Sequence, residues 1–121
     1  MPARVTVDIK GLEDRFAPKK LKDAQTLFAM QVGEDMNAYV HVDSQQLHDS
    51  MRTNSDFERG QIVWSAKDER GQDYAQHAYE EDPGPRDKNP KATPHWDKAA
   101  SADHHEDWRK SAATLLNGGT L

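Results

Sequence analysis

Residues 18–39, PKKLKDAQTLFAMQVGEDMNAY, form the most regular stretch of the sequence. Apolar side chains recur in it every three or four positions, which is the period of one face of an α-helix. Pro18 suits the first turn, and Gly33 is expected to weaken the helix by ~1 kcal/mol relative to alanine. We therefore predict a long amphipathic helix here. Its apolar positions are Leu21, Ala24, Phe28, Val32, Met36 and Tyr39, with Leu27 beside them.

Strand-like patterns lie on both sides of this helix. Residues 4–9 (RVTVDI) alternate between apolar and polar side chains, and residues 61–66 (QIVWSA) are rich in residues that favour strands. Residues 51–57 also alternate, and residues 58–60 (ERG) are typical of a turn. We therefore predict an antiparallel hairpin made by residues 51–57 and 61–66, with residues 4–9 as a further short strand.

Three further helices are predicted. One covers residues 44–50, with Ser44 as its cap and Leu47 as its buried residue. A second covers residues 73–81, and a third runs from residue 95 or 96 to residue 116, where Asn117 and the glycines after it end it. The expected fold is α+β: a long N-terminal amphipathic helix and a C-terminal helix packed on a small antiparallel sheet.

Proline is concentrated in residues 82–94, which hold four of the six prolines of the chain. We predict an extended loop or arm in which almost nothing is buried. Residues 117–121 are expected to form a flexible tail, and residues 1–121 a single domain. The candidates for contact between this arm and a neighbouring subunit are Pro83, Pro85, Arg86, Pro90 and Pro94.

The composition predicts a domain with a thin core. Leu, Ile, Val and Phe together supply only 18 of 121 residues, so the chain has little apolar surplus and gains from a partner surface. Charge is uneven as well: residues 1–22 hold six basic and three acidic groups, and residues 43–82 hold four basic and ten acidic ones. This asymmetry fits either head-to-tail contact between copies or a merely solvated surface.

Several classes of protein are disfavoured. The chain has no cysteine, which excludes disulfides, cysteine-ligated metals and a thiol nucleophile. No apolar run is long enough to span a membrane, and the first residues do not resemble a secretory signal. The net charge of −5 argues against a dedicated DNA-binding surface.

No catalytic pattern is convincing. His104, His105, Glu106 and Asp107 invite a metal site, but a metalloprotease helix needs histidines four residues apart, and Arg109 stands at that place. No serine has a local nucleophile elbow, and no glycine-rich loop could hold phosphate. We expect no enzyme activity and no cofactor, with a small metal-dependent hydrolase kept as an alternative.

The order of features resembles the minor capsid, or head–tail connector (neck and tail-completion), proteins of tailed bacteriophages. Three residues depart from the pattern of that family: His41 replaces Pro, Gln45 replaces Gly and His48 replaces Arg. Gln45 matters most, because a positive φ costs glutamine more than glycine. The matching residues are Asp35, Asn37, Tyr39, Val40, Asp43, Ser44 (for Thr), Leu47, Ser50, Ile62-Val63-Trp64, Tyr74-Ala75, Tyr79, Asn89-Pro90, Trp96 and Trp108.

The resemblance implies a non-enzymatic virion protein, made in the bacterial cytoplasm, that forms a ring at the neck between portal and tail. Its partners would be copies of itself and the portal or adaptor and tail proteins, with no specific nucleic-acid recognition and no membrane. A cytoplasmic acidic regulator that binds a protein partner is the main alternative. The residues expected in the core or at an interface are Leu21, Phe28, Val32, Met36, Tyr39, Val40, Leu47, Ile62, Trp64, Tyr74, Tyr79, Trp96 and Trp108.

Overall fold

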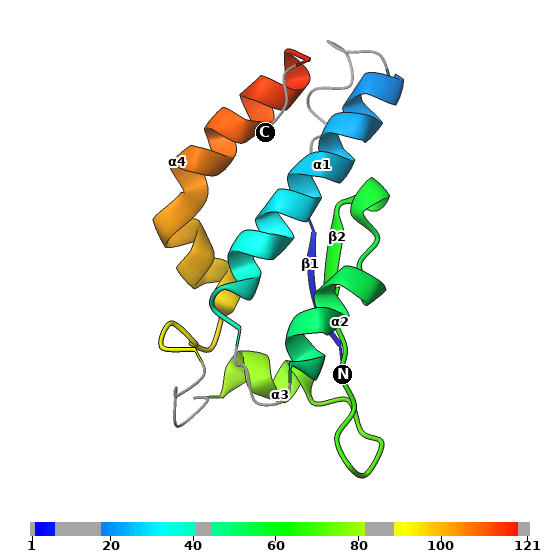
Figure 1. Cartoon of the computed structure of the whole chain (residues 1–121), viewed down its shortest axis with the longest axis vertical. Coiled ribbons are helices and arrows are strands. Elements are labelled where there is room, and N and C mark those ends of the chain that lie inside the picture. The colour runs from blue at the N-terminus through cyan, green and yellow to red at the C-terminus, as the bar shows by residue number, and fades with distance from the viewer. Residues whose placement is uncertain (1, 7–17, 41–44, 82–88, 119–121) are drawn as a thin grey trace.

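The computed structural model describes residues 2–6, 18–40, 45–81 and 89–118. Two long helices, α1 and α4, lie side by side, and α2 and a two-stranded sheet lie on the other side of α1 (Figure 1). The fold is α+β. Its elements are β1 (Ala3–Thr6), α1 (Pro18–Asn37), α2 (Gln46–Asn54), the 3-10 helix η2 (Phe57–Arg59), β2 (Gln61–Trp64), α3 (Ala75–Glu80) and α4 (Trp96–Leu116).

The helix α1 ends at Asn37, two residues before the expected end, and Tyr39 and Val40 are buried in the turn that follows. Gly33 lies where α1 approaches its neighbours most closely. A Cβ atom at Gly33 would lie 2.8 Å from Sδ of Met51 in α2 and 3.4 Å from Cγ2 of Ile62 in β2. The residue that weakens the helix locally therefore lets three elements pack together.

The sheet joins distant parts of the chain. β1 pairs with β2 in antiparallel register, with Ala3 opposite Trp64 and Thr6 opposite Gln61. The predicted hairpin between residues 51–57 and 61–66 is therefore wrong, although an isolated bridge joins Asp56 to Gln61. Residues 7–9 of the predicted first strand lie outside the described residues.

Residues 51–54, predicted as part of a strand, continue helix α2 instead. Leu47 and Met51 are both buried and lie one helical turn apart. A helix brings these two side chains together on one face, whereas a strand would hold them far apart along its length. The buried Ser50 donates a hydrogen bond to the carbonyl of Leu47 at 2.6 Å and accepts one from the amide of Ser65 at 3.1 Å. These two bonds fasten α2 to the segment that follows β2.

Aromatic rings fill the centre of the core. Trp64 of β2 and Trp96 of α4 are both fully buried, and their ring centroids lie 5.2 Å apart in an edge-to-face arrangement. Tyr79 of α3 packs edge-on against Trp96 at 5.0 Å. Through these rings the C-terminal helix is packed on the small sheet.

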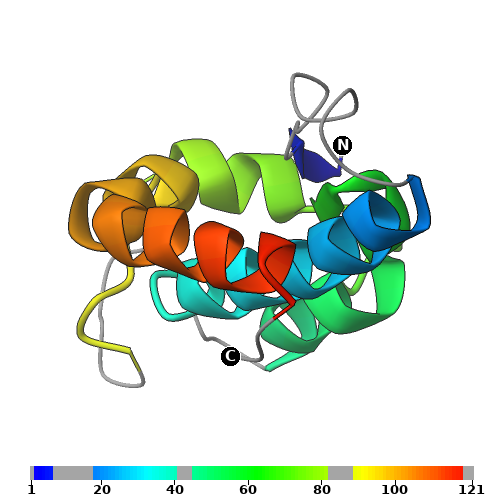
Figure 2. The same cartoon turned by 90° about the horizontal axis from the view of Figure 1, so that it is seen from above.

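The helices α1 and α4 run antiparallel, as the two views of the molecule show (Figures 1 and 2). Leu115, near the end of α4, lies beside Ala24, near the start of α1. At the opposite end, Trp108 and Asp103 reach Asp35 and Tyr39. Hydrogen bonds therefore add to the apolar contacts that hold α1 and α4 together.

The second half of the proline-rich segment is not the exposed arm that the sequence suggests. Ala92 is buried, and the amide of Thr93 donates a hydrogen bond to the carbonyl of Tyr39 at 3.1 Å. The side-chain amide of Asn89 donates to the carbonyls of Ala38 and Val40 at 2.9 and 2.8 Å. Residues 89–93 thus satisfy three carbonyls beyond the end of α1, and such partners are what buried backbone groups require.

The prolines and the arginine that are candidates for contact with a neighbouring subunit differ in their surroundings. Pro90 is exposed and Pro94 is half-buried. Pro83, Pro85 and Arg86 lie outside the described residues.

Replacing Asn89 with alanine should lower the free energy of unfolding by about 1–3 kcal/mol, because two carbonyls lose their donor. Denaturant unfolding followed by circular dichroism measures the change. Pro90→Ala, at an exposed neighbour, is the matched control. An Asn89→Ala variant as stable as the wild type would show that residues 89–93 are not fastened to α1.

Gln45 takes the left-handed conformation, with φ of 65°, at the position that precedes α2. It is the N-cap residue and makes no side-chain capping bond there. The expected cap, Ser44, lies outside the described residues. The backbone thus keeps a conformation that glycine adopts readily, and glutamine adopts it at a cost.

Gln45→Gly should therefore raise the free energy of unfolding by about 0.5–1 kcal/mol, since relief of strain exceeds the entropy that glycine adds to the unfolded chain. The neighbouring Gln46→Gly, inside the helix, should lower it. Thermal or urea melts of the two variants measure the opposite signs. If both variants lost stability, the left-handed conformation at Gln45 would be refuted.

Candidate functional site

The end of α1 carries a buried polar hub, made of Asn37, His48 and Trp64. Asn37 is only 1% exposed. Its side chain accepts a hydrogen bond from Nε1 of Trp64 at 2.9 Å and donates one to the carbonyl of His48 at 2.9 Å. Nε2 of His48 lies 2.5 Å from the carbonyl oxygen of Asn37, which places a proton on that nitrogen, since a carbonyl only accepts. One amide therefore ties α1 to both α2 and β2.

The residues on either side of Asn37 reach α4. Nε1 of Trp108 donates to Asp35 at 2.7 Å, and the hydroxyl of Tyr39 donates to Asp103 at 2.5 Å. His104 is stacked on Trp108 and meets the ring of Tyr39 edge-on, with centroids 6.2 Å from each. Positions 35 and 39 thus bind α4, and position 37 between them binds β2 and α2.

Two tyrosines of this framework have raised pKa values. The hydrogen bond to Asp103, together with burial, raises the pKa of Tyr39 from its usual 10.0 to about 12. Burial, together with a 2.6 Å hydrogen bond to Asp97, raises the pKa of Tyr79 to about 12. Both hydroxyls are therefore held as neutral donors.

This predicts a loss of stability in alkali. Because the folded-state pKa lies above that of the unfolded chain, the contribution of each tyrosine is complete below pH 10 and is lost as the pH rises through about 12. Urea midpoints measured between pH 9 and pH 12 should fall for the wild type and fall less for the Tyr39→Phe/Tyr79→Phe variant. An equal fall in both proteins would contradict these pairings.

Catalytic groups are not gathered into a site in the part of the chain that the structure describes. No group of three or more His, Cys, Asp or Glu side chains there could hold a metal ion. His104 faces Asp107 at 3.9 Å and His105 faces Glu106 at 3.6 Å, each pair separately. The hydroxyl of Ser65 donates to Asp73 and not to a histidine. Among the described helices, none is both long and apolar enough to cross a membrane.

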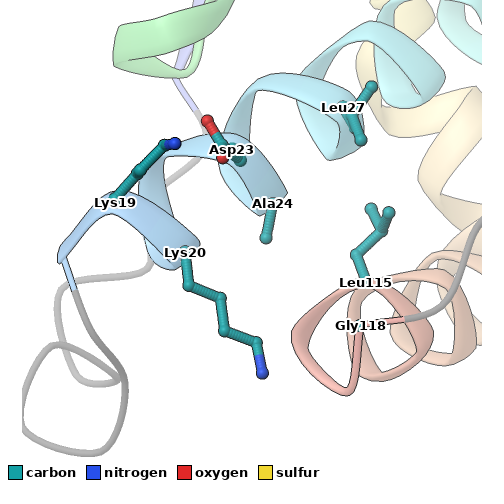
Figure 3. A pocket seen from close by; sticks show the side chains of 7 residues that line it. All are labelled: Lys19, Lys20, Asp23, Ala24, Leu27, Leu115 and Gly118. Atoms are coloured by element: carbon teal, nitrogen blue, oxygen red, sulfur yellow. The ribbon is translucent and has the colours of Figure 1, made fainter.

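The exposed apolar surface gathers on α1. Leu27 is 49% exposed and Met30 is 43% exposed, and no other large apolar side chain is counted as exposed among the described residues. Leu27 also forms a wall of an open pocket of about 480 Å³ between the start of α1 and the end of α4 (Figure 3). The pocket is lined by Lys19, Lys20, Asp23, Ala24, Leu27, Leu115 and Gly118.

The described residues thus form a hydrogen-bonded framework with an exposed apolar pair on α1. In a comparison with known proteins, a family model described as minor capsid protein matches residues 3–115. The chain belongs to the minor capsid protein family. The match spans nearly the whole sequence and confirms the resemblance drawn from the order of its residues. No curated protein and no solved structure matches the chain.

As a minor capsid protein, the chain is a structural component of a virion and acts through contacts with other virion proteins. The matching residues 35, 37 and 39 hold its framework together from inside. The surface that meets other proteins must therefore be sought elsewhere, on side chains that reach solvent.

The structure places the sequence-predicted residues of this minor capsid protein as follows. Phe28, Tyr74, Tyr79 and Trp108 are partly buried and pack against the core. The remaining nine are buried: Leu21, Val32, Met36, Tyr39, Val40, Leu47, Ile62, Trp64 and Trp96.

The exposed pair on α1 lies outside the apolar face that the sequence predicts. The predicted face has Leu27 beside it and does not include Met30. A signal was present, because Leu27 and Met30 lie off the stripe formed by Leu21, Phe28 and Val32 and share a face of their own.

Proposed function

We propose that this minor capsid protein is a non-enzymatic subunit of a ring at the neck of a tailed bacteriophage, between the portal and the tail. Family membership supports a structural role in the virion. The position at the neck rests on the resemblance of the sequence order to head–tail connector proteins.

The observation that carries self-assembly is the exposed apolar pair on α1. Leu27 and Met30 are one helical turn apart and are the large apolar side chains that stand exposed among the described residues. A chain with so few large apolar residues loses stability by leaving two of them in water. A contact that covers this pair stabilises the assembled form over the free one.

A ring also suits the uneven charge of the chain. Ring subunits use heterologous contacts, in which one surface meets a different surface of the next copy. The start of α1 is basic, with Lys19, Lys20 and Lys22. Glu80 ends α3 and Glu81 follows it, and α3 lies at the opposite end of the molecule from the start of α1 (Figure 1). Unlike faces of this kind favour contact between different surfaces over contact between like ones.

The test is the mass of the purified full chain, measured by size-exclusion chromatography with light scattering, together with its capture by the portal and tail proteins of the same phage. We expect a defined oligomer, or one that forms when the portal or tail protein is added. A chain that stays monomeric and binds neither would refute the proposed function. Binding to a host regulator, with absence from virions, would favour the alternative of a cytoplasmic regulator.

A further inference from the structure

The exposed pair belongs to a longer ridge on α1. Asp23, Leu27, Met30 and Glu34 follow one another at intervals of four, three and four residues, so they line one side of the helix. All four are exposed. Glu34 is fixed by Arg52, which donates to it at 2.6 and 2.8 Å. We call these four residues the α1 ridge: two apolar side chains between two carboxylates.

Charge argues against pairing of this ridge with itself. In an antiparallel pair of α1 helices centred on Leu27 and Met30, Asp23 of one copy faces Glu34 of the other. In a parallel pair, each carboxylate faces its own equivalent. Like charges placed opposite each other oppose association, so the α1 ridge fits a different surface with basic ends.

The exposed side of α4 offers a surface with basic ends. Lys98, Ala102, His105 and Arg109 follow at intervals of four, three and four residues, and all four are exposed. We call them the α4 track. Its ends are basic, and Ala102 lets another helix come close. Lys98 and Arg109 are eleven residues apart, as are Asp23 and Glu34, which is about 16 Å along each helix.

We infer that the α1 ridge of one copy packs against the α4 track of the next copy. This inference rests on the proposed ring and names its contact surface. Within one molecule α1 and α4 are antiparallel (Figure 1), and a small rotation between neighbours about a ring axis keeps their directions opposed.

The antiparallel register then pairs unlike charges at both ends. Asp23 faces Arg109. Glu34, which keeps Arg52 of its own chain, faces Lys98 as a second cation. Met30 lies opposite Ala102 at the centre. Arg109 exchanges its exposed partner Glu106, 3.0 Å away, for Asp23 of the neighbour. Such exposed pairs are weak, so the exchange costs little and mainly selects the register.

The absence of cysteine makes disulfide cross-linking a clean test. Met30→Cys and Ala102→Cys in the same full chain should give a ladder of covalent oligomers on mild oxidation, because facing helices bring these positions within disulfide range. Both positions are exposed, so the variants should fold, and circular dichroism verifies that they do. The matched control is Asp23→Cys with Ala102→Cys, whose cysteines are about 10 Å out of register along the helices.

Each outcome bears on the inference. A ladder from the 30/102 pair and little from the 23/102 pair supports it. Covalent dimers from Met30→Cys alone would show that α1 pairs with itself and would overturn it. A wild-type oligomer whose 30/102 variant forms no ladder would also overturn it but leave the proposed ring intact. A wild-type chain that is monomeric even with its virion partners would remove both proposals.

Discussion

Replacing Trp64 with alanine is expected to lower the free energy of unfolding by about 3–5 kcal/mol. Trp64 is fully buried, packs edge-to-face against Trp96, and donates its indole proton to Asn37. The alanine variant loses the ring, leaves a cavity and strips Asn37 of its donor. Urea unfolding of the two proteins measures the difference. A loss below about 1 kcal/mol would mean that Trp64 is not in the core.

Trp96 provides a matched comparison for the hydrogen bond. Its indole nitrogen is buried and finds no hydrogen-bond partner among the described residues. Trp64→Phe leaves Asn37 without its donor, whereas Trp96→Phe removes a proton that has no acceptor there. Trp64→Phe should therefore cost about 1–2 kcal/mol more than Trp96→Phe. Equal losses would contradict the role of the Trp64–Asn37 bond.

The second large effect is expected at Asn37, where Asn37→Leu should lower the free energy of unfolding by about 2–4 kcal/mol. Leucine is similar in size to asparagine but forms no hydrogen bonds. It leaves the indole proton of Trp64 and the carbonyl of His48 without partners, and each unsatisfied buried group costs about 1–3 kcal/mol. Denaturant melts measure the loss, and Asn54→Leu, on the exposed side of α2, is the control.

A double-mutant cycle separates this bond from general damage. Asn37→Leu and Trp64→Phe together should cost less than the sum of the two single changes, because the double variant leaves neither partner of that bond unpaired. The expected coupling is about 1–2 kcal/mol. Additive losses would show that the two side chains do not act as a pair.

The predictions that the structure confirms are those made from local sequence patterns. The pattern in residues 18–39 corresponds to α1, and the aromatic and alanine residues after His95 correspond to α4. Residues 61–64 form β2 as expected from their β-branched and aromatic side chains. These elements are long or strongly patterned, so information within each stretch suffices.

The partner of β2 could not be read in this way. Residues 51–57 are close in sequence and alternate, which favoured a hairpin, yet β2 pairs with β1 at the start of the chain. Residues 51–57 contain only two large apolar residues, Met51 and Phe57. Met51 also fits a helical face with Leu47, and both are buried. Long-range pairing depends on which apolar faces meet in three dimensions, and this is absent from a local pattern.

The residues that make the interior hydrogen bonds stand out in the sequence, but their partners do not. Asp35, Asn37 and Tyr39 belong to the family pattern, and the structure shows what they do: Asp35 and Tyr39 bind α4, and Asn37 binds β2 and α2. Asn89 also belongs to the family pattern, yet the prolines around it predict an extended segment. Two side-chain hydrogen bonds fasten it to the end of α1, and composition does not reveal such bonds.

The proposed place of this minor capsid protein at the neck is tested by its position in purified phage particles. A peptide tag added to the C-terminus of the chain and labelled with gold-conjugated antibody would show it by electron microscopy. We predict one cluster of label per particle, at the junction of head and tail. Label spread over the capsid, or absent from particles that contain the portal, would contradict the account.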